Sequence, residues 1–376
     1  MDLIQTPGRV VLALNAGSSS LKFGLYAVDP GSPKGLLSGS AETRAGGGYG
    51  EFHLTDGSGQ ALQIEMAAEV EGSPIDRIAG LLDRLALPPP TAIGHRIVHG
   101  GPACRRHVLI DADVMRQLDA AVAFAPLHLP PAMTLLRMAR ERFTGIPHVA
   151  CLDTAFHVDM PLLARMLPIP RRFHDMGVER YGFHGLSCES IIHQLGEALP
   201  PRLVIAHLGH GASVTAVANG RSVDTSMGLT PAGGMMMSTR CGDIDPGVLT
   251  YLLRELGCSA ADIDTMVHRD SGMLAVSGTS GDMRELRRAA AHDPEARLAI
   301  AMFCQSVRKH VAAMASVLGG VDLLVFTGGI GEHDAEARMS ICEGLAGLGV
   351  NRIVTLPTDE AQVIARHTGM LASVRG

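Results

Sequence analysis

Residues 10–28 read VVLALNAGSSSLKFGLYAV, a strand-turn-strand unit that decides the fold. The apolar, β-branched residues 10–15 are typical of a buried strand, and residues 21–28 predict a second strand after the small-residue turn. The same layout returns at residues 203–218, LVIAHLGHGASVTAVA, where another Gly-rich turn separates two strands. Two similar halves of this kind predict a duplicated fold with a cleft between the halves.

Helices are predicted between these strands. Residues 130–142 open with Pro-Pro and carry apolar residues near helical spacing, and residues 293–318 begin with Asp-Pro-Glu, which supplies an N-cap and a Pro in the first turn. Gly319 ends the second helix, and residues 322–327 form a strand that runs into a third Gly-rich turn, GGIGE. This alternation predicts the α/β class. Two segments without motifs, residues 30–60 and 71–75, are predicted to be surface loops or a small excursion from the core.

The composition excludes several classes of protein. A chain of 376 residues suits two domains, and a hydrophobic share of 46% allows a large core. The net charge of −6 provides no basic stripe for nucleic acid, and the chain has no Trp to stack single-stranded bases. We therefore expect no nucleic-acid partner.

The cysteines and the apolar stretches bear on location. The seven cysteines are an odd number and include no C-x-x-C pair, so we expect neither a disulfide framework nor a structural zinc site. We expect the protein to lie in the cytoplasm, where the reducing conditions keep cysteines free. The N-terminus predicts no signal peptide. Residues 311–327, the longest apolar stretch, are interrupted by Gly319, Gly320 and Asp322, which predicts a buried helix followed by a strand and no membrane partner.

The first Gly-rich turn lies within residues 15–22, NAGSSSLK. Backbone amides in a turn of small residues can approach phosphate oxygens closely, and the three hydroxyls and Lys22 add donors and a charge. A plain hairpin turn is the alternative, because Gly and Ser are ordinary there. The spacing differs from that of a Walker A loop.

Arg96 and Asp153 lie in strand-like stretches. A buried Arg needs an anionic partner, and its planar guanidinium fits a carboxylate or a phosphoryl group; a structural ion pair is the alternative for Arg96. Asp153 closes an apolar strand, where α/β proteins place ligand groups, so it binds a metal, positions a nucleophile or caps a helix. We interpret His157 as a packed core residue.

Two further residues carry potential chemistry. His184 is flanked by Gly in RYGFHG and is therefore accessible. Residues 224–245 are dense in Gly, Met and hydroxyls; the Met run indicates packing, whereas Arg240 is harder to explain in that way. Two Arg, one His, one Asp and three Gly-rich turns suit in-line phosphoryl transfer, in which catalysis is mostly positioning and charge neutralisation.

Nine motifs occur in a fixed order: NAGSSSLKF, HRIVHGG, LDTAFH, YGFHG, HLGHGAS, TSMGLTP, TRCGDIDP, DSGMLAVSG and FTGGIGE. From about residue 10 to about residue 367 this order resembles the acetate kinases of the acetate and sugar kinase/Hsp70/actin superfamily. The resemblance implies a duplicated actin-like (ribonuclease H-like) fold with an interdomain cleft. It implies one domain over residues 1–150, with residues 367–376 packing back on it, and a second over residues 151–366 that carries the nucleotide loops.

The resemblance also implies roles for individual residues. The implied catalytic residues are Asp153, His184 and Arg240. Acetate binding falls on Arg96, with an apolar pocket for the methyl group formed by Val98, Leu127, Phe183 and Pro231. The metal falls on Asn15 and Glu360, and contacts with the nucleotide and its phosphates fall on Lys22, His207, Leu208, Gly209, His210, Gly211, Asp282, Met283, Arg284, Gly329, Ile330, Gly331, Glu332 and His333.

The implied reaction is a reversible transfer of the ATP γ-phosphoryl group to acetate, dependent on Mg²⁺ or Mn²⁺, by a cytoplasmic homodimer. A propionate kinase is the alternative, because the sequence does not fix the pocket volume. Another phosphoryl donor is a second alternative, because His210, Met283 and His333 depart from the family pattern. A slow ATPase of the actin or chaperone type is the rival from another class.

Overall fold

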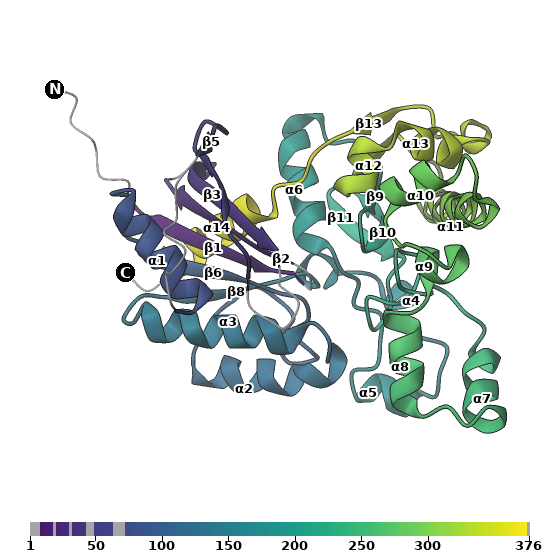
Figure 1. Ribbon diagram of the computed structural model, residues 1–376, viewed down its shortest axis with the longest axis horizontal. Helices are drawn as coiled ribbons and strands as arrows, with labels where there is room; N and C mark the ends of the chain where they lie inside the picture. Colours follow the sequence, from purple (N-terminus) through teal and green to yellow (C-terminus); the bar gives the residue numbers. More distant parts are fainter. Residues whose placement is uncertain (1–7, 18–19, 30–31, 43–48, 63–71, 374–376) are drawn as a thin grey trace. The chain divides into compact units, whose positions relative to one another are not determined.

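A computed structural model describes residues 8–17, 20–29, 32–42, 49–62 and 72–373. The contacts within the chain divide it into two compact units: Met1–Ala155 with Asp359–Gly376, called unit 1 here, and Phe156–Thr358, called unit 2. Each unit holds one sheet with helices (Figure 1), which confirms the predicted α/β class. The first boundary lies after residue 155, where the sequence-based limit was residue 150. The second lies before residue 359, where the sequence-based limit was residue 367, because the whole C-terminal helix belongs to unit 1.

Unit 1 contains an eight-stranded sheet in the order β5-β4-β3-β2-β1-β6-β8-β7. The first two strands form the predicted antiparallel hairpin, with Val10 opposite Ala27 and Ala16 opposite Leu21. The strands β1, β6 and β8 are parallel, so their carboxyl ends share one edge of the sheet. The strands are β1 (Val10–Ala16), β2 (Ser20–Ala27), β3 (Lys34–Glu42), β4 (His53–Asp56), β5 (Ala61–Leu62), β6 (Ala92–Ile97), β7 (Val108–Leu109) and β8 (His148–Leu152).

Helices cover both faces of this sheet. They are α1 (Pro74–Arg84), α2 (Ala112–Ala120), α3 (Leu129–Arg142) and α14 (Glu360–Ala372), with a 3₁₀ turn at Ala121–Phe124. Ile93 packs in the core with side chains of α1 and α3, whereas the next residue, Gly94, faces α14. A Cβ on Gly94 would lie 2.2 Å from Thr368 Oγ1, so the helix can pack here only against glycine. In Figure 1, α14 (yellow) lies among the purple strands although it comes from the end of the chain.

The alternative of surface loops was wrong for residues 34–42 and 53–56, which form strands of the sheet. Residues 30–60 contain β3, which pairs with β2, and β4, which pairs with β3. The sequence of β3, KGLLSGSAE, is rich in Gly and Ser, so its pairing with a neighbour, and not a local apolar pattern, defines it. Of residues 71–75, the described residues 72 and 73 precede α1 and residues 74 and 75 begin it; Ser73 and Asp76 form its capping box.

Unit 2 contains a five-stranded sheet in the order β11-β10-β9-β12-β13. The second predicted hairpin is present, with Ala212 opposite Leu208, and β12 runs parallel to β9. The predicted apolar stretch at residues 311–327 forms the end of a helix and then β12. The strands are β9 (Arg202–Leu208), β10 (Ala212–Ala218), β11 (Arg221–Thr225), β12 (Leu323–Thr327) and β13 (Ile353–Thr355).

The helices of unit 2 surround these strands. The longest, α11, begins after the N-cap Asp293, whose side chain accepts two backbone amides, and ends at Gly319 in the left-handed region, as predicted. The helices are α4 (Leu162–Arg165), α5 (Arg171–Asp175), α6 (Gly185–Leu195), α7 (Pro246–Glu255), α8 (Ala260–His268), α9 (Gly272–Ser277), α10 (Met283–Ala289), α11 (Pro294–Leu318), α12 (Gly328–His333) and α13 (Ala335–Cys342). Shorter 3₁₀ turns lie at Ala155–His157, Gly196–Ala198 and Leu345–Leu348.

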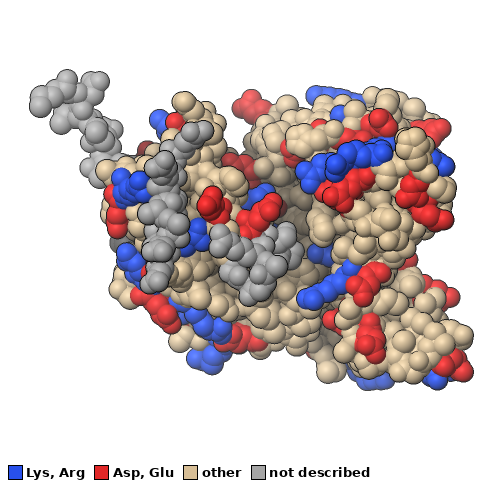
Figure 2. Space-filling model, in the orientation of Figure 1, with Lys and Arg blue, Asp and Glu red and all other residues tan. Residues whose placement is uncertain are grey.

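The surface carries both signs of charge. On the face shown in Figure 2, basic and acidic side chains are interspersed, in keeping with the small net charge. Over the described part of the chain, every helix is too short or too polar to cross a membrane.

Candidate active site

Four polar residues meet at one edge of the unit 1 sheet. Asn15 lies near the end of β1, Arg96 lies near the end of β6, and Asp153 directly follows β8. Glu360 is the first residue of α14. Because β1, β6 and β8 are parallel neighbours, the polar residues at their carboxyl ends come together, at the edge where α/β proteins place ligand groups.

Hydrogen bonds join these four side chains. Arg96 donates from Nε to both carboxylate oxygens of Asp153, and its Nη2 lies 2.6 Å from Oδ2. Its Nη1 donates to the amide oxygen of Asn15 at 3.0 Å, and the Asn15 amide nitrogen donates to Glu360 Oε2 at 2.8 Å. Arg96 thus has the anionic partner that a buried guanidinium needs, while both of its Nη atoms keep N–H groups for a further anion.

Arg96 stays charged in its buried setting. The Asp153 side chain is 1% exposed and that of Arg96 is 16% exposed. Burial alone would lower the pKa of Arg96, but the charges of Asp153 and then Glu360 outweigh it, and the pKa is raised. The site therefore presents a fixed cation at every physiological pH.

The other predicted residues of unit 1 lie nearby in the fold. Lys22 is exposed and faces Asn15 across the β1–β2 ladder, so both side chains project from the same face of the sheet. Val98 follows β6 and is buried, and Leu127 lies half-buried just before α3. Phe183 and Pro231, the other two predicted walls of the methyl pocket, belong to unit 2, where both are buried.

In unit 2, His184 and Arg240 come together at Gly211. A Cβ added to Gly211 would lie 3.1 Å from Arg240 Nη1 and 3.3 Å from His184 Nε2. Arg240 Nη1 also donates to the backbone oxygen of Pro231 at 3.1 Å. A cation and an imidazole nitrogen therefore converge on the turn between β9 and β10, residues 209–211, which the sequence predicts to bind phosphate.

His184 is held firmly in this position. It precedes α6 with φ 59°, in the left-handed region that few non-glycine residues adopt. Its Nδ1 lies 3.0 Å from Ser213 Oγ, and its ring stacks on His207 with centroids 4.2 Å apart. The Ser213 contact engages Nδ1, and Nε2 faces Gly211. Ser213 was not among the predicted site residues.

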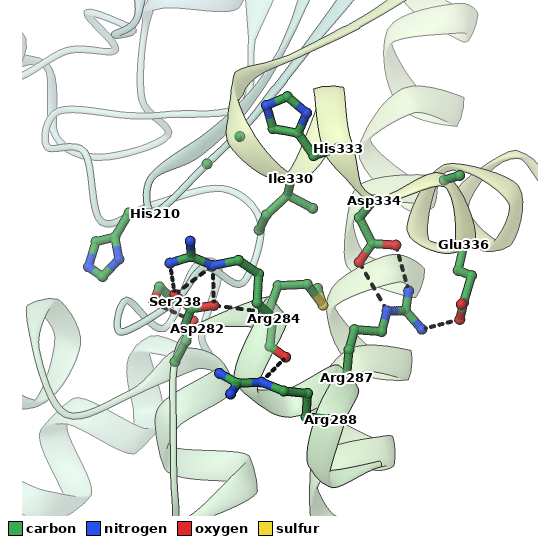
Figure 3. A pocket seen from close by; sticks show the side chains of 15 residues that line it. His210, Ser238, Asp282, Arg284, Arg287, Arg288, Ile330, His333, Asp334 and Glu336 are labelled. Atoms are coloured by element: carbon green, nitrogen blue, oxygen red, sulfur yellow. Dashed lines mark hydrogen bonds and ion pairs between the residues drawn. The ribbon is translucent and has the colours of Figure 1, made fainter. Parts of the chain in front are cut away.

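A pocket of about 900 Å³ adjoins this turn. Figure 3 shows its side chains, with Arg284 folded back onto Asp282 and Arg287 between Asp334 and Glu336. The pocket is lined by eight predicted nucleotide residues, namely Gly209, His210, Asp282, Met283, Arg284, Gly329, Ile330 and His333. Seven lining residues were not predicted: Ser238, Gly281, Arg287, Arg288, Asp334, Ala335 and Glu336.

The pocket forms where two Gly-rich turns meet. Gly328 has φ 77°, and a Cβ there would lie 2.7 Å from the backbone oxygen of Leu208, so only glycine permits this approach. A Cβ on Gly209 would lie 4.0 Å from the Gly329 nitrogen. Burial, and then the charge of Arg240, lower the pKa of His210, so this imidazole is neutral at neutral pH.

The remaining predicted nucleotide residues lie beside the pocket and support it. Leu208 is fully buried in the sheet and Gly331 is buried in α12. Glu332 accepts the Gly328 amide with its side chain at 3.0 Å, which stabilises the turn. His207 stacks on His184, as described above.

His157 is a core residue, as predicted. Its ring nitrogens contact Ser222 Oγ at 2.8 Å and the Phe183 backbone oxygen at 3.0 Å. Burial lowers its pKa to about 4, so the ring is neutral. The predicted catalytic residues therefore form two groups, one around Arg96 and Asp153 in unit 1 and one around His184 and Arg240 in unit 2.

Comparison with known proteins identifies the family. The model of the Acetokinase family matches residues 10–374. The chain is 40% identical to the acetate kinase of Methylocella silvestris, over 96% of this chain and 97% of that protein. A propionate kinase from Francisella tularensis has a TM-score of 0.84 at 36% identity, covering 96% of this chain and 100% of its own. The acetate kinase of Porphyromonas gingivalis has a TM-score of 0.80 at 33% identity, covering 97% and 100%. This chain belongs to the acetokinase family.

Proposed function

We propose that this protein is an acetate kinase that transfers the γ-phosphoryl group of ATP to acetate. The observation that carries the proposal is the convergence of Arg240 and His184 on Gly211, beside a pocket of about 900 Å³ lined by Gly-rich turns. Phosphoryl transfer needs such donors, because negative charge spreads over the equatorial oxygens in the transition state. A slow ATPase of the actin or chaperone type would not require this pair together with Arg96.

In the proposed reaction one bond to phosphorus forms and one bond to phosphorus breaks. A carboxylate oxygen of acetate bonds to the γ-phosphorus while the bond from that phosphorus to the β,γ-bridging oxygen breaks. ADP leaves with the electron pair and acetyl phosphate forms without net transfer of a proton. Arg240 and His184 Nε2 hydrogen-bond the transferring group, and Arg96, held by Asp153, binds the acetate carboxylate through its remaining N–H groups.

The donor set of unit 1 fits a magnesium ion. Asn15, Asp153 and Glu360 offer an amide oxygen and two carboxylates, the hard oxygen ligands that Mg²⁺ and Mn²⁺ take in kinases. Asn15 donates to Glu360 and accepts from Arg96, which also donates to Asp153, so these contacts hold the three at one edge of the sheet. A bound Mg²⁺ would offset the charge of the nucleotide phosphates.

The substrates are tested by a hydroxamate assay for acyl phosphate. Acetate, propionate and butyrate are each combined with ATP, GTP and pyrophosphate, and kcat/KM is measured. We expect the highest value for acetate with ATP. A higher value for propionate would identify a propionate kinase, since one methylene is worth only about 1–3 kcal/mol in an apolar pocket. ATP hydrolysis without acyl phosphate would contradict the proposal.

Arg240 is the residue tested next in this assay, with an exposed arginine as the matched control. We expect Arg240→Ala to lower kcat by about 10³-fold, as loss of a key cation does in phosphoryl transfer. Arg116 lies on α2 with a side chain that is 71% exposed, away from the described pocket, so Arg116→Ala should retain activity. Near-normal turnover of the Arg240 variant would remove this residue from the mechanism.

We further propose that the protein is a cytoplasmic homodimer. The apolar surface of α7 supports this, because none of its residues is buried while Val248, Tyr251 and Leu253 are 39–51% exposed. The neighbouring α8 likewise has no buried residue. Exposed apolar side chains gathered in this way are typical of an interface with a second subunit.

A further inference from the structure

A second pocket lies at the opposite edge of the unit 1 sheet from Asn15 and Asp153, where the parallel strands begin. Its volume is about 480 Å³. Arg9 precedes β1, Thr91 precedes β6, His148 opens β8 and Arg140 lies in the last turn of α3; all four line it. Of the described residues that line this pocket, two are arginines and none is acidic.

Arg140 differs from the other arginines near the end of α3 because it has no acidic partner among the described residues. The other two arginines of the last turns of α3 have acidic partners: Arg137 pairs with Asp119, and Arg142 lies 3.7 Å from Asp76. Arg140 is half-buried and makes no hydrogen bond or ion pair with any residue that the structure describes. A half-buried cation without a partner is uncommon, because desolvation is then uncompensated. Packing therefore does not explain Arg140.

Arg9 adds a second positive charge with only neutral partners. Its Nη1 donates to the Gly369 backbone oxygen at 2.8 Å and to Ser373 Oγ at 2.7 Å, at the carboxyl end of α14. These contacts explain the position of the side chain but leave its other N–H groups available. The carboxylate of Asp29, which accepts the Gly8 amide, lines a neighbouring groove and not this pocket.

The remaining walls are neutral. His148 Nδ1 lies 2.9 Å from Nε2 of the buried His95, and its Nε2 faces the Phe143 backbone oxygen at 3.3 Å, so the pair uses its polar atoms internally. Ile110, Ile146 and Pro147 supply an apolar surface. The pocket thus offers a positive field, guanidinium donors and room for a short carbon body.

We propose that this pocket binds a small organic dianion, a phosphate monoester or a short dicarboxylate, between Arg140 and Arg9. A guanidinium pairs with either oxyanion through two parallel hydrogen bonds, and the carbon body packs on Ile110, Ile146 and Pro147. The site is separate from the residues assigned to phosphoryl transfer, so it stands whether or not acetate is the substrate.

The test is calorimetric titration at constant ionic strength with glycerol phosphate, succinate and uncharged glycerol. It uses the full chain carrying Arg240→Ala, which weakens anion binding at the proposed catalytic centre. We expect at least one dianion to bind with a Kd of about 1 mM or tighter and glycerol not to bind. The dianion that binds more tightly identifies the class; no binding by either overturns the proposal.

Variants assign the binding to this pocket. Arg140→Gln removes no contact among the described residues, so we expect its Tm without ligand to be unchanged and its Kd to weaken about tenfold or more. Arg142→Gln, on the same helix, is the matched control and should change Kd less than about twofold. Arg9→Gln provides a second variant, expected to weaken binding as well. Equal losses in the Arg140 and Arg142 variants, or none in the former, would contradict the assignment.

Discussion

The hydrogen atom on the Cα of Gly211 sets the space available to Arg240 and His184. A methyl group there would approach Arg240 Nη1 to 3.1 Å and His184 Nε2 to 3.3 Å, closer than ordinary contact. Both contacts are with the ends of side chains, so we expect Gly211→Ala to fold but to displace the donors. Turnover should fall about 10–100-fold, because misplacement by an ångström has such effects.

The comparison for this prediction is Gly347→Ala, where an added Cβ meets nothing within 4 Å. That variant should keep its kcat in the hydroxamate assay and its Tm. If Gly211→Ala turned over at the wild-type rate, the donors would not be held as tightly as their contacts with Gly211 indicate.

Asp153 is expected to stabilise the fold, and this contribution can be measured separately from catalysis. Replacing it by Ala leaves the guanidinium of Arg96 buried beside Asn15 without its main counter-charge. We expect Asp153→Ala to lower the free energy of unfolding by about 3 kcal/mol, as removal of one partner of a buried pair does. Urea unfolding measures this loss.

A double-mutant cycle then isolates the pair. In Arg96→Met/Asp153→Ala the uncompensated charge is gone, so its stability should exceed that of Asp153→Ala alone. Additive losses would show that the two side chains are not coupled, contrary to the distances between them.

At the scale of elements, helices and strands marked by a local sequence pattern could be predicted, whereas strands defined by pairing with a neighbour could not. The β1–β2 hairpin and α11 were predicted because apolar runs, the Asp293 cap and Gly319 mark them within a few residues. The strand β3 was missed because Gly and Ser weaken its pattern, and it exists through its partners β2 and β4. Its neighbours in space, and not in sequence, decide its structure.

The strands β6 and β8 also predict how stability depends on pH. His95 and His148 are buried against each other, and burial lowers the pKa of both below the ordinary value of 6.5. Below that pH the unfolded chain binds protons that the folded chain does not, so stability is complete above about pH 7 and falls as the pH decreases. We expect stability to fall measurably between pH 7 and 5.5, with the larger part from His95, whose pKa burial lowers well below the ordinary value.

The free energy of unfolding by urea, measured at both pH values, tests this expectation. The variant His95→Gln/His148→Gln should reduce the dependence on pH, while His157, whose pKa burial lowers to about 4, should keep part of it. An unchanged slope in the double variant would mean that the pair does not control acid stability.

At the scale of the whole molecule, the candidate site could be predicted only in part. Its glycines and its catalytic candidates stand in short motifs that the sequence displays directly. Arg287 on α10, Asp334 at the N-cap of α13 and Glu336 on α13 were missed because each has the appearance of an ordinary solvated charge in the sequence. Their place in the pocket follows from the ion pairs that join Arg287 of α10 to Asp334 and Glu336, which single motifs do not encode.

The whole molecule also carries a prediction about assembly. A solvated helix is usually polar, yet α7 exposes Tyr251 by 51% and Leu253 by 43%, and Leu256 at its end is 61% exposed. Burial against a second subunit would remove this apolar surface from water and would stabilise the dimer by about 25 cal/mol per Å² buried.

We therefore expect a dimer by light scattering at micromolar concentration, and a monomer for Tyr251→Asp/Leu256→Asp. Met339→Asp, which changes a side chain 68% exposed on α13, should remain dimeric. If the double variant dimerised like the wild type, α7 would not be the interface, and its apolar side chains would need a different partner.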